Sequence, residues 1–232
     1  MQILVIDVGG SNVKFTVWRK REVRKIPSGP DFTPMQAVKQ ILSLTADWKY
    51  DAVSIGFPGL IVRGKITQAT CNLGNGWNGF DFEKHFRKRV KIMNDAAMQA
   101  LGSYEGGRML FLGLGTGLGS TLILDDVIIP LALGDLPHSR KWTLGETLGK
   151  RGLKRLGKKA WEESIHVTVK GLGSAFDAEY VVLGGGNVKH LNKLPIGARR
   201  GDNDNAFIGG ARLWGLAGIQ AKLRKKHTWV MT

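Results

Sequence analysis

The chain has 232 residues, 43% of them hydrophobic and 32 of them glycine, which is enough for one large domain or two small ones with a proper core. No apolar run approaches the roughly 20 residues that a membrane span needs. The opening stretch, MQILVIDVGG, lacks the basic start and the small-residue cleavage site of a signal peptide. Cys71 is the single cysteine, which excludes an internal disulfide and a cysteine-based zinc site. We therefore expect a cytoplasmic protein that holds no zinc.

The charge of the chain is strongly positive. Lysine and arginine number 34 against 19 acidic residues, which leaves a net charge of +15. An excess of this size favours an anionic partner such as nucleic acid, polyphosphate or acidic lipid, or it reflects only a solvated cationic surface. The sequence has no zinc-finger spacing and no RNA-recognition aromatic motif, and its seven tryptophans are scattered. We expect neither a specific nucleic-acid partner nor a membrane partner.

Strand-like and helix-like segments alternate along the chain, which predicts an α/β architecture. Strands are predicted at 2–7, 13–18, 52–59, 91–95, 108–124 (two strands around a turn) and 181–187, and helices at 33–46, with Thr33 as a possible N-cap, and after residue 95. Two strand–glycine turn–strand units lie 106 residues apart, from Gly9 to Gly115. This repetition predicts two related halves that hold a ligand between them, with a hinge near Asn94–Asp95.

Three glycine-rich turns are candidates for binding phosphate groups. Glycines let successive backbone N–H groups converge on phosphate oxygens, where a Cβ would crowd them. Asp7, at the end of the first strand, could hold Mg²⁺ through waters, and Lys14 could add positive charge. An ordinary hairpin or close strand packing would account for the same glycines. The predicted phosphate and cofactor residues are Asp7, Gly9, Gly10, Ser11, Asn12 and Lys14 in the first turn, Gly115, Thr116 and Gly117 in the second, and Gly184, Gly185 and Gly186 in the third.

Asp95 is the candidate catalytic base. It follows the strand KIM at the start of a predicted helix, and its place in the sequence is between the first two glycine turns. Phosphoryl transfer needs positioning, charge stabilisation and one group that accepts the hydroxyl proton, which suits a carboxylate. Asn94 beside it could orient neighbouring hydroxyls, because an amide both donates and accepts hydrogen bonds. A plain helix N-cap is the alternative interpretation of Asp95.

These segments together resemble the ROK family of sugar kinases, especially its polyphosphate-glucokinase-like branch. The similar stretches occur in the family's order over about residues 3–215 and are DVGGSNVK, GFPGLI, TCNLGNGWNGFDF, NDAAMQALG, LGLGTGLGS and VVLGGGN. The resemblance implies a two-domain actin/hexokinase-type (ribonuclease H-like) fold with a ligand cleft between the domains. It implies a small N-terminal domain over 1–94, a larger C-terminal domain over 95–232, and a helix near 206–220 that packs back onto the first.

The resemblance also implies a function. It makes the chain a sugar kinase with Asp95 as general base, glucose at its 6-OH as the acceptor, Mg²⁺, ATP or polyphosphate as the donor, and a homodimer. The implied sugar-binding residues are Asn94, Asn72, Gly59, Asp135 and Glu146. Where many members carry Glu-x-Gly-His, this chain reads Ala132-Leu133-Gly134-Asp135, and the cysteine-rich zinc motif is absent. The identity of the sugar and the integrity of catalysis therefore stay open, and His138 is a candidate replacement for the missing histidine.

A basic stretch offers a track for a polyanionic donor. Lys150, Arg151, Lys154, Arg155, Lys158 and Lys159 recur at helical spacing with no acidic residue among them, and Leu153, Leu156 and Ala160 are expected on the opposite face. A solvated helix face is the alternative.

Two further functions stay open on the sequence. One is a non-catalytic, sugar-responsive regulator of the same family, although the first strand starts at residue 3 and leaves no room for a preceding helix-turn-helix. The other is a kinase for mannose or an amino sugar.

Overall fold

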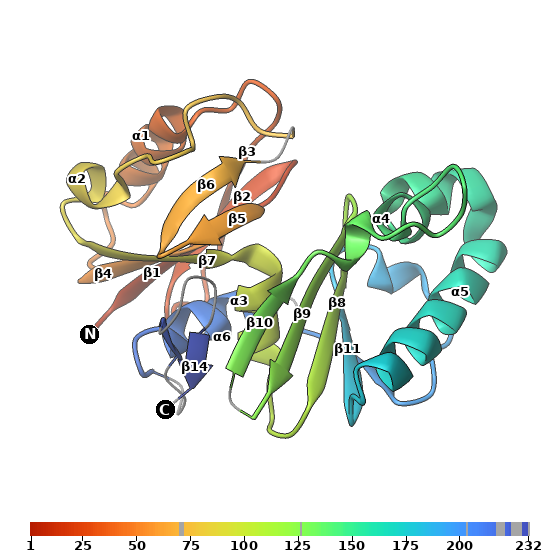
Figure 1. The fold of residues 1–232 in the computed structure, drawn as a ribbon. Helices are drawn as coiled ribbons and strands as arrows, with labels where there is room; N and C mark the ends of the chain where they lie inside the picture. Colours follow the sequence, from red (N-terminus) through yellow and green to blue (C-terminus); the bar gives the residue numbers. More distant parts are fainter. Residues whose placement is uncertain (70–71, 126, 203, 217–220, 224–228, 232) are drawn as a thin grey trace.

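The computed structural model describes residues 1–69, 72–125, 127–202, 204–216, 221–223 and 229–231. Two lobes make up this part of the chain (Figure 1). The first contains β1 (Ile3–Val8), β2 (Asn12–Val17), β3 (Arg24–Pro27), α1 (Pro34–Leu44), β4 (Ala52–Phe57), β5 (Gly59–Val62), β6 (Lys65–Ala69), α2 (Phe82–Phe86) and β7 (Arg89–Asn94). The following elements are α3 (Asp95–Ser103), β8 (Met109–Leu114), β9 (Leu118–Leu124), β10 (Val127–Leu131), η1 (Leu133–Asp135), α4 (Leu144–Leu148), α5 (Lys150–Ala175), β11 (Tyr180–Gly184), η2 (Val188–His190), β12 (Ala198–Arg200), α6 (Asn205–Arg212), β13 (Ala221–Leu223) and β14 (Trp229–Met231).

Each lobe is built on one sheet. The first sheet has the order β3-β2-β1-β4-β7, and the second has the order β12-β11-β8-β9-β10-β14-β13. In the first sheet β1, β4 and β7 are parallel, so their carboxyl ends meet at one edge. Each sheet also contains an antiparallel hairpin, β1–β2 in the first and β8–β9 in the second. The predicted α/β alternation is confirmed, including the repeated strand–turn–strand unit.

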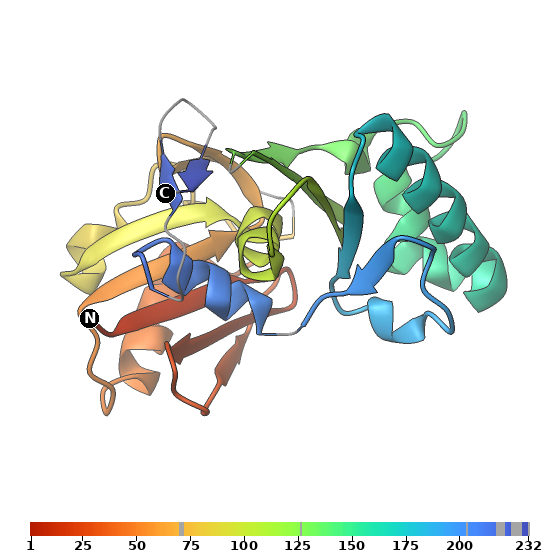
Figure 2. The same cartoon turned by 90° about the horizontal axis from the view of Figure 1, so that it is seen from below.

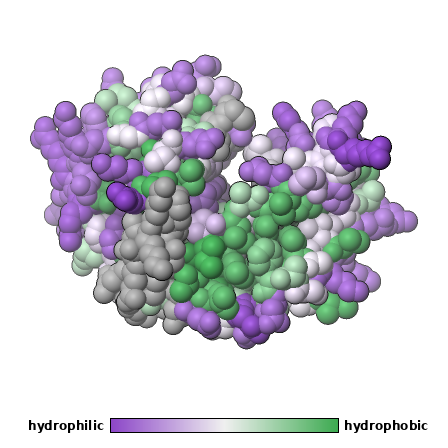
Figure 3. Space-filling model, in the orientation of Figure 1, coloured by the Kyte–Doolittle hydropathy of each residue, from purple (hydrophilic) through white to green (hydrophobic). Residues whose placement is uncertain are grey.

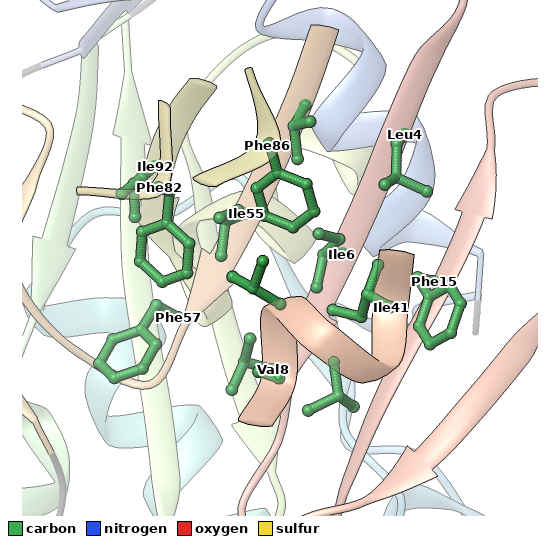
Figure 4. Packing of buried hydrophobic residues seen from close by; sticks show 14 of the residues in the cluster. Leu4, Ile6, Val8, Phe15, Ile41, Ile55, Phe57, Phe82, Phe86 and Ile92 are labelled. Carbon is green, nitrogen blue, oxygen red and sulfur yellow. The ribbon is translucent and has the colours of Figure 1, made fainter. Parts of the chain in front are cut away.

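Helices α3 and α6 lie between the two sheets (Figure 2). The two-residue period of the strands creates this layering, because alternate side chains point to opposite faces. On β1, Ile3 and Val5 belong to the core around α3 and α6, whereas Leu4, Ile6 and Val8 face α1 and α2 (Figure 4). On the second sheet, the far face packs on α4 and α5.

Local signals fix some helix ends. Thr33 caps α1 as predicted, and with Gln36 it forms a capping box. The predicted helix near 206–220 is shorter, since α6 ends at Arg212 and residues 213–215 form a turn in which Gly215 has a φ of +76°. Residues 217–220 of that prediction lie outside the described residues. Within the described part of the chain, every helix is too short or too polar to span a lipid bilayer.

Helix α6 packs closely on its neighbours. The Ser54 hydroxyl of β4 donates to the Gly210 carbonyl at 2.7 Å, and the Trp214 indole N–H donates to the Ser54 hydroxyl at 2.8 Å. A Cβ on Gly209 would overlap the carbonyl oxygen of Met98 on α3. The C-terminal segment therefore lies against both the first sheet and α3.

Replacing Gly209 by alanine should destabilise the protein by about 1–3 kcal/mol, because the added methyl group meets backbone that cannot rotate away. Urea unfolding would measure the change. Gly171→Ala is the matched control, since a Cβ on this exposed glycine of α5 meets nothing within 4 Å. Equal stability of the two variants would contradict the close packing of α3 and α6.

Candidate active site

The carboxyl edge of the first sheet brings the two predicted catalytic-site carboxylates together. Asp7 is in register with Gly56 of β4, and the next residue of β4, Phe57, is in register with Asn94 of β7. Asp95 follows Asn94 directly and begins α3. The negative charge of Asp95 is close enough to raise the pKa of Asp7. Asp7 and Asp95, which are 88 positions apart in the sequence, therefore form one acidic site.

Burial shifts the pKa values of both carboxyl groups upward. Removal from water, followed by the charge of Asp95, raises the pKa of Asp7 to about 7, although Lys14 opposes this shift. Lys14 lies directly opposite Asp7 on β2. Removal from water also raises the pKa of Asp95 to about 6, against hydrogen bonds from the N–H groups of Ala96 and of Asp95 itself. Perturbed carboxyl groups of this kind are typical of functional sites.

Asn94, and not Asp95, caps helix α3. The Asn94 side-chain oxygen accepts a hydrogen bond from the N–H of Ala97 at 3.1 Å, and its amide donates to the Gly59 carbonyl at 3.3 Å. The Asp95 carboxylate accepts a hydrogen bond from the adjacent Ala96 N–H at 2.8 Å. The alternative interpretation of Asp95 as a plain N-cap is therefore wrong, because its neighbour performs that role.

Both hairpin turns present free N–H groups. Among the described residues, no backbone hydrogen bond uses the N–H of Gly10 or Ser11 in the first turn, or of Thr116 or Gly117 in the second. The Ser28 hydroxyl holds the first turn by donating to the Gly9 carbonyl at 2.6 Å. Free N–H groups on adjacent residues of a turn are suited to binding an anion.

The second turn leaves open space where side chains would stand. A Cβ on Gly115, Gly117 or Gly186 would meet nothing within 4 Å, and none of the three has a positive φ. Neither backbone conformation nor internal packing therefore requires glycine at these positions, in contrast to Gly185, whose φ is +85° and whose Cβ would lie 2.5 Å from the Leu114 carbonyl oxygen. The open space at these three glycines allows a ligand to approach the backbone closely.

The third glycine turn lies against the second. Gly184 is in register with Gly113, and the Asn187 side chain donates to the Gly115 carbonyl at 2.7 Å. The same carbonyl accepts the N–H of Lys150 at 3.0 Å. Sequence reasoning did not assign roles to Asn187 or Ser28, and it placed Lys150 in the basic stripe without predicting the bond from its N–H to the second turn. The asparagine directly after the glycine triplet was the one local signal for these contacts.

The predicted sugar residues come from both lobes, and Figure 3 shows a hollow between the lobes. On the first lobe, Asn72 lies beside the first turn, because a Cβ on Gly10 would be 3.3 Å from the Asn72 Cβ. A cavity of about 550 Å³ lies beside the same loop, lined by residues that include Gln68, Leu73, Asn75 and Trp77.

On the second lobe, η1 carries Asp135 and α4 carries Glu146. The two elements pack together, since a Cβ on Gly145 would lie 3.0 Å from the Gly134 carbonyl oxygen. Asp135 and His138 are exposed, and Glu146 is partly buried. Glu146 closes a capping box with Thr143 through a hydrogen bond of 3.1 Å, which gives it a local structural role.

Comparisons with known proteins identify the family and the fold. The model of the ROK family matches residues 3–132, which is more than half of the chain. The chain belongs to the ROK family. No curated protein matches it.

Solved structures of other ROK proteins share the fold. An inorganic polyphosphate/ATP-glucomannokinase from Arthrobacter sp. strain KM is 22% identical, with a TM-score of 0.76 over 90% of this chain and 96% of the other. A ROK glucokinase from Streptomyces griseus, solved with glucose and AMPPNP, is 15% identical, with a TM-score of 0.74 over 92% and 99% of the two chains. A ROK transcriptional regulator is 14% identical, with a TM-score of 0.63 over 90% and 76%. The predicted two-domain actin/hexokinase-type fold with an interdomain cleft is confirmed.

The basic stripe of this ROK protein is broken. All six of its residues are exposed, but Gly157 inside α5 has φ +76° and ψ +163°, which is not helical. The predicted single face is therefore wrong, and Leu156 and Ala160, expected on the opposite face, are exposed. Arg155 stacks 3.9 Å from the Trp142 ring centroid, and Lys158 donates to the Asn192 side chain at 2.6 Å. Lys150, Arg151 and Lys154 lie before the break, on the segment that begins beside the second turn.

Replacing Asp7 by asparagine should stabilise the protein at about pH 8 by ~1–2 kcal/mol, a value reduced for the partial exposure of the side chain. The folded-state pKa of about 7 is above the ordinary 3.8, so the ionised carboxylate costs stability at high pH. The difference should decrease as the pH falls through 7 and vanish below about pH 3, where the carboxyl group is neutral in both the folded protein and the unfolded chain. Urea unfolding at several pH values would measure it, with the exposed Asp31→Asn as the control. A pH-independent difference would contradict the buried ionisation.

Proposed function

We propose that this ROK protein is a sugar kinase that transfers a phosphoryl group from ATP or polyphosphate to a hexose hydroxyl, with the 6-OH of glucose as the first candidate. The observation that carries the proposal is the pair Asp7–Asp95 at the carboxyl end of the first sheet. The first turn, with free N–H groups, follows Asp7, and the hairpin that carries the second turn meets α3 at Ala96, the residue after Asp95. The two carboxyl groups of raised pKa and the free backbone N–H donors of the turns thus belong to one region of the protein. We also propose the cytoplasm as its location and a homodimer as its assembly.

Asp95 acts as the general base. The sugar oxygen attacks the terminal phosphorus of the donor and forms a new P–O bond, while the bond from that phosphorus to the bridging oxygen breaks. The hydroxyl proton passes to the Asp95 carboxylate. With a pKa of about 6, Asp95 is ionised at neutral pH and is a stronger base than an exposed aspartate.

The two turns bind the phosphates. The free N–H groups of Thr116 and Gly117 and the open space at Gly115 suit the donor, and those of Gly10 and Ser11 suit the transferred group. Asp7 would hold Mg²⁺, and its acceptor oxygens fit a hard cation. A bound Mg²⁺ neutralises donor phosphate charge and favours the ionised form of Asp7.

The acceptor sugar lies between Asn94, Asn72 and Gly59 of the first lobe and Asp135 and Glu146 of the second. Asn94 keeps one amide hydrogen beyond the contact with Gly59, which is available to a hydroxyl. Mannose or an amino sugar is the alternative acceptor, because Asp135 stands where many relatives have histidine.

The start of α5 favours a polyanionic donor. Hydrophilic side chains gather over the upper end of the second lobe, where α4 and the first turns of α5 lie (Figure 3). Lys150 and Arg151 occupy the first turn of α5, where the helix dipole disfavours cations, and no acidic residue accompanies them. A chain of phosphates leaving the second turn would compensate this unfavourable placement.

A coupled phosphorylation assay on a small sugar panel, with Mg²⁺ and either ATP or polyphosphate, tests the function. Asp95→Asn should lower kcat by about a hundredfold or more and leave the sugar Kd within threefold, because it removes the proton acceptor and keeps the shape. Sugar binding without turnover in the unaltered protein would instead favour the regulator, the class to which one structural neighbour belongs.

The activity should also fall as the pH decreases below about 7. Protonation of Asp95, with a pKa of about 6, removes the base, and protonation of Asp7, with a pKa of about 7 before Mg²⁺ binds, opposes binding of the cation. The two groups interact, so the acid limb of kcat/KM should report the pair and not one residue. A rate that stays constant from pH 8 to pH 5 would contradict this role.

Reversing the charges of Lys150, Arg151 and Lys154 should raise the polyphosphate KM at least tenfold and leave the sugar KM unchanged. The matched control reverses Lys39, Lys49 and Lys65, which are exposed on the first lobe. Equal polyphosphate KM values in the two variants would contradict a donor role for the start of α5.

A further inference from the structure

The helix that carries the base packs against the second phosphate hairpin, and Gly119 makes the contact nearest to that base. Gly119 is the second residue of β9, two positions after Gly117 of the turn. A Cβ placed on Gly119 would lie 2.9 Å from the Cβ of Ala96, closer than real Cβ atoms approach. When Gly119 and its two sequence neighbours are left aside, the Ala96 methyl group is the one atom of the described residues within 4 Å of this Cβ position. The strand backbone therefore rests directly on the first turn of α3.

Ala96 is coupled to the base through the backbone. It follows Asp95 directly, and its N–H donates to the Asp95 carboxylate at 2.8 Å. Ala96 is 5% exposed and Ala97 is fully buried, so this turn is packed on both sides. A displacement of Ala96 would displace Asp95 with it.

On the opposite side of the same turn, the neighbouring side chain can move. Gly56 of β4 faces it from the first sheet, and a Cβ there would overlap the terminal methyl group of Met98 and lie 3.5 Å from the Asp95 Cα. A methionine end can rotate away, whereas the Ala96 methyl group is fixed to the backbone. The contact with Gly119 is thus the rigid one of the two.

We infer that Gly119 is a positioning residue, which sets the separation between the Asp95 base and the phosphate held by the second hairpin. The inference rests on the proposed kinase function and adds a residue to it. Because Gly119 has no positive φ, its backbone conformation is open to alanine, and the missing side chain is explained by the contact alone. In-line transfer is sensitive to small displacements of the reacting groups.

The test compares Gly119→Ala, Ala96→Gly and the double variant that exchanges the two residues. Gly119→Ala should lower kcat by roughly 10–100-fold, while the KM values for sugar and donor stay within threefold, because the turns keep their N–H groups. The double variant should recover at least half of that loss on a logarithmic scale, since the methyl group is moved from one side of the contact to the other. Ala96→Gly alone keeps the N–H that binds Asp95 and should lose less than threefold.

Thermal unfolding and a matched glycine separate positioning from general damage. Gly171→Ala, on the exposed face of α5, should leave kcat unchanged. Recovery of kcat in the double variant without recovery of Tm supports positioning. A Gly119→Ala protein with unchanged kcat, or a double variant as slow as Gly119→Ala, would overturn the inference.

An unaltered protein without turnover would contradict the kinase function and not the contact. The contact would then be tested by crystal structures of the unaltered protein and the variants. The Asp95 carboxylate should be displaced in Gly119→Ala, together with the first turn of α3, and return to its place in the double variant. An unchanged position of Asp95 in all variants would overturn the inference.

Discussion

Burial of α3 between two sheets is the constraint on which the rest of the structure depends. Helix α3 is covered by strands of both sheets and by α6, and it buries the small residues Ala96, Ala97, Ala100 and Gly102 together with Met98 and Leu101. The backbones of α3 and α6 approach each other closely, and this helix pair connects the two lobes. The amino end of α3, with Asp95, is thereby held beside Asp7 of the first hairpin and beside Gly119 of the second.

The same burial gives the site its chemistry at a cost in stability. Two carboxyl groups taken out of water and placed near each other resist ionisation, which raises the pKa of Asp7 to about 7 and that of Asp95 to about 6. The two carboxylates stay close together, although their ionisation is unfavourable, because the packing of the surrounding core fixes their positions. Lys14 and the N–H groups around Asp95 offset part of the cost.

Positive charge and backbone donors complement these carboxylates. The turns contribute N–H groups that no other part of the described chain uses, and the first turn of α5 adds cations beside the second turn. The departures at Ala132 and Asp135 fall among the residues proposed for the sugar, and the residues proposed for the phosphates keep the pattern of the resemblance. The donor half of the site is accordingly better defined than the acceptor half.

The sequence by itself determined the α/β alternation, the two hairpin turns, the Thr33 cap and the family, because period, turn chemistry and motif order are local properties. About half of the site could be named in this way, including Asp7, Asp95 and the glycines. Only the tertiary structure decided that Asn94 is the cap, that Asn187 and Lys150 hold the second turn, that Gly157 breaks α5, and that Gly119 meets Ala96. These features depend on strand register and on which backbones approach within a few ångströms, and a linear pattern does not encode either quantity.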